Sequence, residues 1–295
     1  MAIKHLLSIN DLNGSDISTI ISRAISSKTM PYSNLLENQT VGIWFEKPSL
    51  RTRLSFEIGV KQLGGATIYL DKDNIGVGTR EPIRDVANVL SRYVCAFIAR
   101  TFAHSTLTEF ANYSSIPIIN ALSDEEHPCQ TLADLVTIQE KFGVLNTIKI
   151  AYIGDGNNVA RSLASGAYHM NIPFISSSPT EYKLTINDPI INDSIIHELD
   201  PGKAIASADV IYTDAWTSMG QEAESEIRKN IFKDYQITEK HLDSTKDTAI
   251  LMHPLPAHHG EEISKDLLYH KKSVVFDQAE NRLHAQRAAM EYLFK

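Results

Sequence analysis

The stretch VGIWFEKPSLRTRLSFE, residues 41–57, joins an apolar strand-like run to a helical pattern through a short polar connection. Residues 41–45 are apolar, and Leu54 and Ile58 then recur at helical spacing, so residues 49–53 are predicted to lie at a helix N-terminus. The same alternation of strand and helix patterns runs along the whole chain, which is typical of parallel α/β architecture.

The chain has 295 residues, more than a single domain usually contains. Strands are predicted near residues 40–45, 66–70, 94–99, 116–120, 148–153, 172–176, 208–213, 249–252 and 273–276. Helices are predicted near residues 16–27, 53–63, 82–92, 130–142, 159–170, 261–268 and 279–293. The helix ending before Gly143 is the natural bridge between halves. We therefore predict two α/β domains, 1–142 and 143–278, each a central parallel sheet flanked by helices.

Composition excludes several classes of partner. The hydrophobic fraction of 43% and charged fraction of 22% are those of an ordinary globular protein. A net charge of −8 argues against nucleic acid and anionic membranes as partners. No apolar stretch approaches transmembrane length, and the N-terminus lacks a long apolar signal region. The two cysteines, Cys95 and Cys129, give no disulfide framework and predict a cytoplasmic location.

The helix start at residues 49–53 is a candidate anion site. Free backbone N–H groups and the helix dipole favour an anion there, and the guanidinium of Arg51 matches phosphate oxygens. Ser49 is a good N-cap, but Thr52 stands where a capping box has Glu or Gln, which leaves donors available. The alternative is an ordinary capped helix with surface arginines.

A second motif, EHPCQTLADL at residues 126–135, indicates a site for a polarised carbonyl. His127 precedes Pro128 at another predicted helix start, where the dipole keeps an imidazole neutral and able to donate to a carbonyl oxygen. Gln130 offers both a donor and an acceptor. Arg100, at the end of CAFIAR, places a fixed charge where a carbonyl oxygen becomes negative during attack. The alternatives are a capping histidine and a surface ion pair.

The order of the motifs S-x-R-T-R, HPCQ, DAWTSMGQE (214–222) and HPLP (253–256) resembles that of the aspartate/ornithine carbamoyltransferase family. The resemblance runs nearly end to end and includes RDVANVLSRY (84–93), IGDGNN (153–158) and DQAENRLHAQRA (277–288). It implies an active-site cleft between the two domains and a C-terminal helix, 279–295, that packs back on the first. It also implies a homotrimer, because the family counterpart of residues 71–82 reaches a neighbouring subunit's site.

The resemblance further implies transfer of a carbamoyl group from carbamoyl phosphate to ornithine, giving citrulline and phosphate, as in arginine biosynthesis. The residues implied to bind carbamoyl phosphate are Ser49, Leu50, Arg51, Thr52, Arg100, His127, Gln130, Leu255 and Arg282. Those implied to bind ornithine are Asn158, Asp214, Ser218 and Met219. Arg100, His127 and Asp214 are implied to be catalytic. No metal or organic cofactor is expected, since positioning and electrostatics can carry the step.

One residue departs from the ornithine branch. The family's ornithine enzymes usually have cysteine where this chain has Pro254, in a form typical of the aspartate branch. Putrescine, acylated ornithine or aspartate as the acceptor, and a non-catalytic relative, therefore stay open alternatives. Asp214 or the departing phosphate must then accept the amine proton.

Other readings of the same residues are less favoured. A nicotinamide-dependent enzyme would need a third glycine where GDGNN is followed by Val159. Cys129 has no evident orienting partner and is not predicted to be a nucleophile. His253, His258 and His259 match no standard zinc spacing, so a solvated loop is predicted. Arg53 is predicted to form a structural ion pair.

Overall fold

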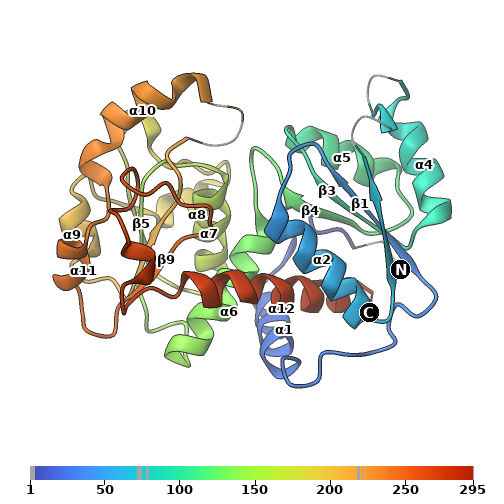
Figure 1. Ribbon diagram of the computed structural model, residues 1–295, viewed down its shortest axis with the longest axis horizontal. Helices are drawn as coiled ribbons and strands as arrows, with labels where there is room; N and C mark the ends of the chain where they lie inside the picture. Colours follow the sequence, from blue (N-terminus) through green and yellow to red (C-terminus); the bar gives the residue numbers. More distant parts are fainter. Residues whose placement is uncertain (1–3, 72–74, 78–79, 218–219, 221, 295) are drawn as a thin grey trace. The chain divides into compact units, whose positions relative to one another are not determined.

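The computed structural model describes residues 4–71, 75–77, 80–217, 220 and 222–294. It divides into two compact units, the first comprising Met1–Val136 and Glu280–Lys295 and the second Thr137–Ala279. The chain passes from one unit to the other inside α6 (Pro128–Phe142) and again inside α12 (Val275–Leu293). Figure 1 shows the sheet and the helices of each unit.

The first unit is built on a four-stranded parallel sheet with the order β2-β1-β3-β4. Its strands are β1 (Thr40–Phe45), β2 (Ala66–Leu70), β3 (Ala96–Arg100) and β4 (Ile118–Leu122). Its helices include η1 (Ile9–Asp11), α1 (Gly14–Ser26), α2 (Leu50–Gln62), α4 (Ile83–Tyr93) and α5 (His104–Tyr113). Because all four strands run the same way, the segments that follow them meet at one edge of the sheet.

Aromatic side chains form part of the first unit's core. Trp44 on β1, Phe97 on β3 and Phe110 on α5 lie with ring centroids 5.1 to 6.3 Å apart and are almost fully buried. On α2, a Cβ at Gly59 would lie 3.3 Å from Met290 Cε of α12, so glycine lets these two helices approach closely. Arg287 of α12 is buried and donates to Gln62 and to the Pro31 carbonyl, which fixes the end of the chain on this unit.

The second unit is built on a five-stranded parallel sheet with the order β7-β6-β5-β8-β9. Its strands are β5 (Ile150–Ile153), β6 (Phe174–Ser177), β7 (Ile196–His197), β8 (Val210–Thr213) and β9 (Ile250–Met252). Its α-helices include α7 (Asn158–His169), α8 (Pro189–Ser194), α9 (Pro201–Ile205), α10 (Ser225–Phe232) and α11 (Glu239–Asp243). Its 3-10 turns include η2 (Thr180–Tyr182), η3 (Glu222–Glu224), η4 (Lys233–Tyr235) and η5 (Leu267–Tyr269).

The predicted two-part parallel α/β fold is confirmed, but two predicted elements are wrong. The apolar run 273–276 is not a strand: Ser273 forms one bridge to Leu251, and α12 begins at Val275. A short β-branched run fits either state, and here the helical continuation decides. Residues 261–268 do not form an α-helix, because Asp266 has a φ of 63° and only the short turn η5 follows. None of the described helices combines the length and low polarity that crossing a membrane requires.

Candidate active site

Segments that follow three strands of the first unit supply the predicted anion site. Phe45 at the end of β1 is in register with Arg100 at the end of β3, and the Glu46 amide donates to the Arg100 carbonyl at 2.8 Å. The loop after β1 leads into α2, and the segment after β4 leads to His127 and α6. Parallel register thus brings two helix starts and a strand-end arginine to the same edge of this sheet.

The α2 N-terminus begins as predicted. Ser49 has extended backbone angles, and its hydroxyl accepts from the Thr52 amide at 3.4 Å and donates to Thr52 Oγ1 at 2.9 Å. Arg282 of α12 donates to Thr52 Oγ1 at 2.9 Å and to Gln130 Oε1 at 2.6 Å. Gln130 in turn donates to Asp134 at 2.8 Å. Arg282 therefore joins α2 to α6 within the first unit.

Three guanidinium groups lie near one another at this edge. Burial first, and then the positive charges of Arg282 and Arg51, lower the pKa of Arg100 to about 10. Burial also lowers the pKa of Arg51. Within the described part of the chain, neither Arg51 nor Arg100 forms an ion pair, and the buried Nε–H of Arg100 has no hydrogen-bond acceptor. Two like charges held together, those of Arg51 and Arg100, with no carboxylate paired to either among the described residues, favour binding of an anion.

His127 is held as a neutral imidazole. It is 4% exposed, and burial, followed by the charges of Arg282 and Arg100, lowers its pKa well below the ordinary value. The sequence analysis predicts a neutral imidazole because of the helix dipole, whereas in the structure burial is the largest cause. A neutral imidazole can donate one N–H to a carbonyl oxygen without adding a fourth positive charge.

We expect the folded protein to keep His127 neutral as the pH falls through 6.5, the ordinary pKa that the ring regains on unfolding. Below that pH the unfolded chain binds more protons than the folded chain. The His127 contribution to stability is therefore complete above pH 6.5 and is lost as the pH falls toward the lowered folded pKa. Side-chain ¹⁵N NMR, with the resonance assigned by His127→Gln, measures the titration. A His127 midpoint at its ordinary pKa would contradict the expectation.

Three neighbouring residues have roles apart from the charge cluster. The apolar side chain of Leu50 is 72% exposed, so this residue can contribute only its backbone N–H to the site. Arg53 pairs with Glu57 at 2.8 Å, as predicted. Cys129 is buried, and burial raises its pKa to about 12, which leaves it a thiol and fits its predicted lack of nucleophilic function.

In the second unit, Asp214 follows β8 and is oriented by Asn157. Asn157 caps α7: its Oδ1 accepts from the Val159 and Ala160 amides, and its Nδ2 donates to Asp214 Oδ2 at 2.8 Å. Burial raises the pKa of Asp214, while the hydrogen bonds from Asn157 and from the Ala215 amide act the other way. The side chain of Asn158, which is predicted to bind substrate, accepts from the adjacent Val159 amide at 3.0 Å.

His253 is fully buried, which corrects the prediction of a solvated loop. Its Nδ1 accepts from the Leu255 amide at 2.9 Å, and its Nε2 lies 3.1 Å from Glu262 Oε1. A proton on Nε2 satisfies both contacts, so His253 donates to Glu262. Leu255 has a φ of 57°, in the left-handed region that a leucine rarely adopts.

The predicted residues fall into two groups. The first unit contains Ser49, Leu50, Arg51, Thr52, Arg100, His127, Gln130 and Arg282, and the second contains Asn158, Asp214 and Leu255. Ser218 and Met219 lie outside the described residues. Sequence reasoning missed Asn157, although its place directly before the helical pattern of α7 is an N-cap signal.

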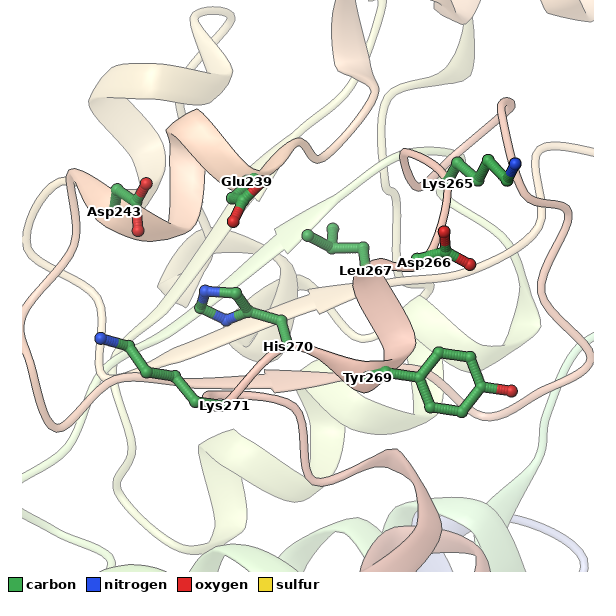
Figure 2. A pocket seen from close by; sticks show the side chains of 8 residues that line it. All are labelled: Glu239, Asp243, Lys265, Asp266, Leu267, Tyr269, His270 and Lys271. Atoms are coloured by element: carbon green, nitrogen blue, oxygen red, sulfur yellow. The ribbon is translucent and has the colours of Figure 1, made fainter.

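A separate pocket of about 590 Å³ lies in the second unit. Figure 2 shows its side chains, which come from α11 and from the segment around η5. It is lined by Glu239, Asp243, Lys265, Asp266, Leu267, Tyr269, His270 and Lys271. None of these residues was predicted to bind substrate, and acidic and basic groups are mixed in its lining.

Two models of one protein family match consecutive parts of the chain. Residues 4–140 match the model of the aspartate/ornithine carbamoyltransferase carbamoyl-P binding domain. Residues 146–293 match the model of the Asp/Orn binding domain of the same family.

Similar proteins cover nearly the whole chain. An ornithine carbamoyltransferase of Archaeoglobus fulgidus is 45% identical over 98% of this chain and 96% of its own length. The crystal structure of ornithine carbamoyltransferase from Thermus thermophilus is 36% identical, with a TM-score of 0.92 and complete coverage of both chains. The ornithine carbamoyltransferase structure from Pyrococcus furiosus is 41% identical, with a TM-score of 0.92, covering 98% of this chain and 96% of that one.

Proposed function

The chain belongs to the aspartate/ornithine carbamoyltransferase family, and we propose that it transfers the carbamoyl group of carbamoyl phosphate to the δ-amine of ornithine, giving citrulline and phosphate. The observation that carries this proposal is the gathering of Arg51, Arg100 and a neutral His127 beside the α2 N-terminus. That arrangement suits a substrate with a phosphate at one end and a carbonyl at the other.

The phosphate is assigned to the start of α2. The backbone N–H groups of residues 50–52 and the guanidinium of Arg51 are donors of the kind that hold phosphate oxygens. Ser49 and Thr52 add hydroxyl groups, and Leu50 adds only its backbone. Arg282, already bonded to Thr52, supports phosphate binding as a second positive charge.

The carbamoyl group is assigned to Arg100, His127, Thr52 and Gln130, with Leu255 as a further contact. When the amine nitrogen attacks the carbamoyl carbon, the carbonyl oxygen becomes negative. Arg100, His127 and Thr52 can stabilise that oxygen by donating hydrogen bonds in a buried site. The tetrahedral centre then collapses by breaking the bond to phosphate oxygen, so phosphate leaves as the carbamoyl–nitrogen bond is kept.

The amino-acid substrate is assigned to the second unit, with Asp214 and Asn158 joined by Ser218 and Met219. An alkyl amine has an ordinary pKa near that of lysine, so presenting it neutral near pH 7 costs on the order of 4 kcal/mol. Burial raises the pKa of Asp214, which makes its carboxylate a better proton acceptor than a free aspartate. With Pro254 in place of the usual cysteine, Asp214 or the departing phosphate takes that proton.

Phosphate release with different amines tests the proposal. Wild-type protein at saturating carbamoyl phosphate is offered ornithine, putrescine, acetylated ornithine and aspartate in parallel, with an amine-free control. We expect ornithine to give citrulline and phosphate in equal amounts and to be the preferred acceptor. Carbamoylation of aspartate alone would contradict the assignment, and phosphate affinity without release from any amine would indicate a non-catalytic relative.

The remaining assignments follow from the same proposal. We assign residues 1–142 with helix 279–295 to carbamoyl phosphate and residues 143–278 to ornithine; the grouping of Glu280–Lys295 with the first unit supports this assignment of the helix. A homotrimer, a cytoplasmic location and a role in arginine biosynthesis complete the proposal. Light scattering of the purified protein measures its mass and tests the trimer.

A further inference from the structure

Arg228 contacts the segments that follow three adjacent strands of the second unit. Its Nη1 donates to Asp155 Oδ2 at 2.9 Å, after β5, and to the Trp216 carbonyl at 3.0 Å, after β8. Its guanidinium lies 4.7 Å from the ring centroid of Tyr182, in the turn after β6. The strands β6, β5 and β8 are neighbours in the sheet. The Arg228 side chain therefore links the three segments that follow them, at the edge of the sheet where ligands bind in such folds.

The guanidinium is held inside rather than at the surface. The Arg228 side chain is 7% exposed and that of Asp155 is 11% exposed. Phe232, one turn further along α10, packs on the rings of both Trp216 and Tyr182. Glu224 also pairs with Arg228 at 3.0 Å but is 57% exposed, so this contact contributes less. The Asp155 pair is therefore the stronger of the two ion pairs.

The carboxylates of Asp155 and Asp214 have different electrostatic surroundings. Burial raises the pKa of Asp155 most, Arg228 opposes that effect, and the charge of Asp214 raises it further. Asp155 and Asp214 thus lie near enough to repel each other. Arg228 neutralises Asp155, whereas Asp214 is oriented by the uncharged Asn157. Of these two carboxylates, Asp155 is the one that pairs with a cation in the described part of the chain.

We propose that Arg228 is a positioning residue for the amine substrate, acting through Asp155 and the Trp216 carbonyl. It fixes the two segments that flank Asp214, and it compensates Asp155 so that Asp214 is left to bind the substrate's ammonium group. This inference rests on the proposed function and deepens it. It assigns to α10 a part in the affinity for ornithine and none in the affinity for carbamoyl phosphate.

Arg228→Met tests the inference, because methionine keeps the apolar stem and removes the charge and donors. With carbamoyl phosphate saturating, we expect the KM for ornithine to rise about 10- to 100-fold, since small displacements of a binding group have effects of this order. Carbamoyl phosphate affinity, measured by calorimetry without the amine, should stay unchanged. Arg228→Lys, which keeps the charge without the two-way hydrogen bonding, should give an intermediate KM.

A second substitution separates positioning from mere stability. Asp155→Asn in the Arg228→Met background removes the uncompensated acid, so part of the lost ornithine affinity should return. Lys229→Met is the matched control, because Lys229 is the next residue on α10 and its pairs with Glu226 and Glu261 are more exposed. It should leave the KM for ornithine at the wild-type value.

Several results would overturn the inference. An unchanged ornithine KM in Arg228→Met, even with a lowered melting temperature, would show a purely structural role. An equal loss of carbamoyl phosphate affinity, or no recovery on adding Asp155→Asn, would do the same. If wild-type protein binds carbamoyl phosphate but releases no phosphate with any amine, the proposed function is wrong, and the inference about Arg228 loses its premise. If the wild-type protein is active and the Arg228 variants have its KM for ornithine, the inference is wrong and the proposed function stands.

Discussion

Arg51→Ala is expected to weaken carbamoyl phosphate binding by about 100-fold, equivalent to about 3 kcal/mol. Arg51 stands at the start of α2, forms no ion pair among the described residues, and contributes to the lowered pKa of Arg100. Its positive charge is therefore available to an anion rather than used within the fold. Calorimetric titration of carbamoyl phosphate in the absence of amine measures the change.

Arg53→Ala is the matched control for this experiment. Arg53 lies two residues along the same helix, but it pairs with Glu57 and its guanidinium lies 4.0 Å from the Tyr69 ring centroid. An exposed pair of this kind contributes little to stability and nothing to the anion site. Equal losses in the two variants would mean that net charge, rather than the α2 N-terminus, determines binding.

Asp214→Asn is expected to lower kcat/KM for ornithine on the order of 100- to 1,000-fold while carbamoyl phosphate affinity is retained. The substitution keeps the shape of the side chain, but asparagine has one acceptor oxygen, so it retains only one of the hydrogen bonds from Asn157 and the Ala215 amide. It removes the negative charge and the proton-accepting oxygen. Steady-state kinetics at saturating carbamoyl phosphate, together with calorimetry, separates the two effects.

Asp209→Asn serves as the control, because Asp209 directly precedes β8 and Asp214 directly follows it. Asp209 accepts from the Lys149 amide and pairs with Lys246 at the opposite end of that strand. Its loss should lower stability somewhat and leave ornithine kinetics unchanged. Retained activity in Asp214→Asn would assign the proton-accepting role to the departing phosphate.

The parts of the fold that could be predicted are those encoded locally. The run 41–45 is apolar and β-branched in part, and the following Pro48 and Ser49 mark a helix start, so both β1 and α2 are readable. The run 273–276 has a similar local character, but α12 begins within it at Val275, and the later part of that helix belongs to the first unit. Local pattern could not distinguish these two outcomes, because packing over long sequence distances decides the second.

The candidate site divides in the same way. Motif residues such as Arg51 and His127 stand at helix starts that the sequence reveals. Arg228 stands in an unremarkable charged helix, and its partner Asp155 is 73 residues away in the chain. His253 was grouped with two neighbouring histidines, yet its buried partner Glu262 lies beyond them. Such contacts depend on the order of the strands in the sheet, which cannot be predicted from the spacing of residues in the sequence.

The first unit is discontinuous, since it needs residues 280–295 in addition to residues 1–136. Arg282, which bonds to Thr52 and Gln130, therefore leaves the ribosome only after the entire second unit has been translated. A nascent chain or a prematurely stopped product possesses the α2 start but lacks one of its guanidinium groups. Synthesis thus delays completion of the anion site until the whole of the second unit exists.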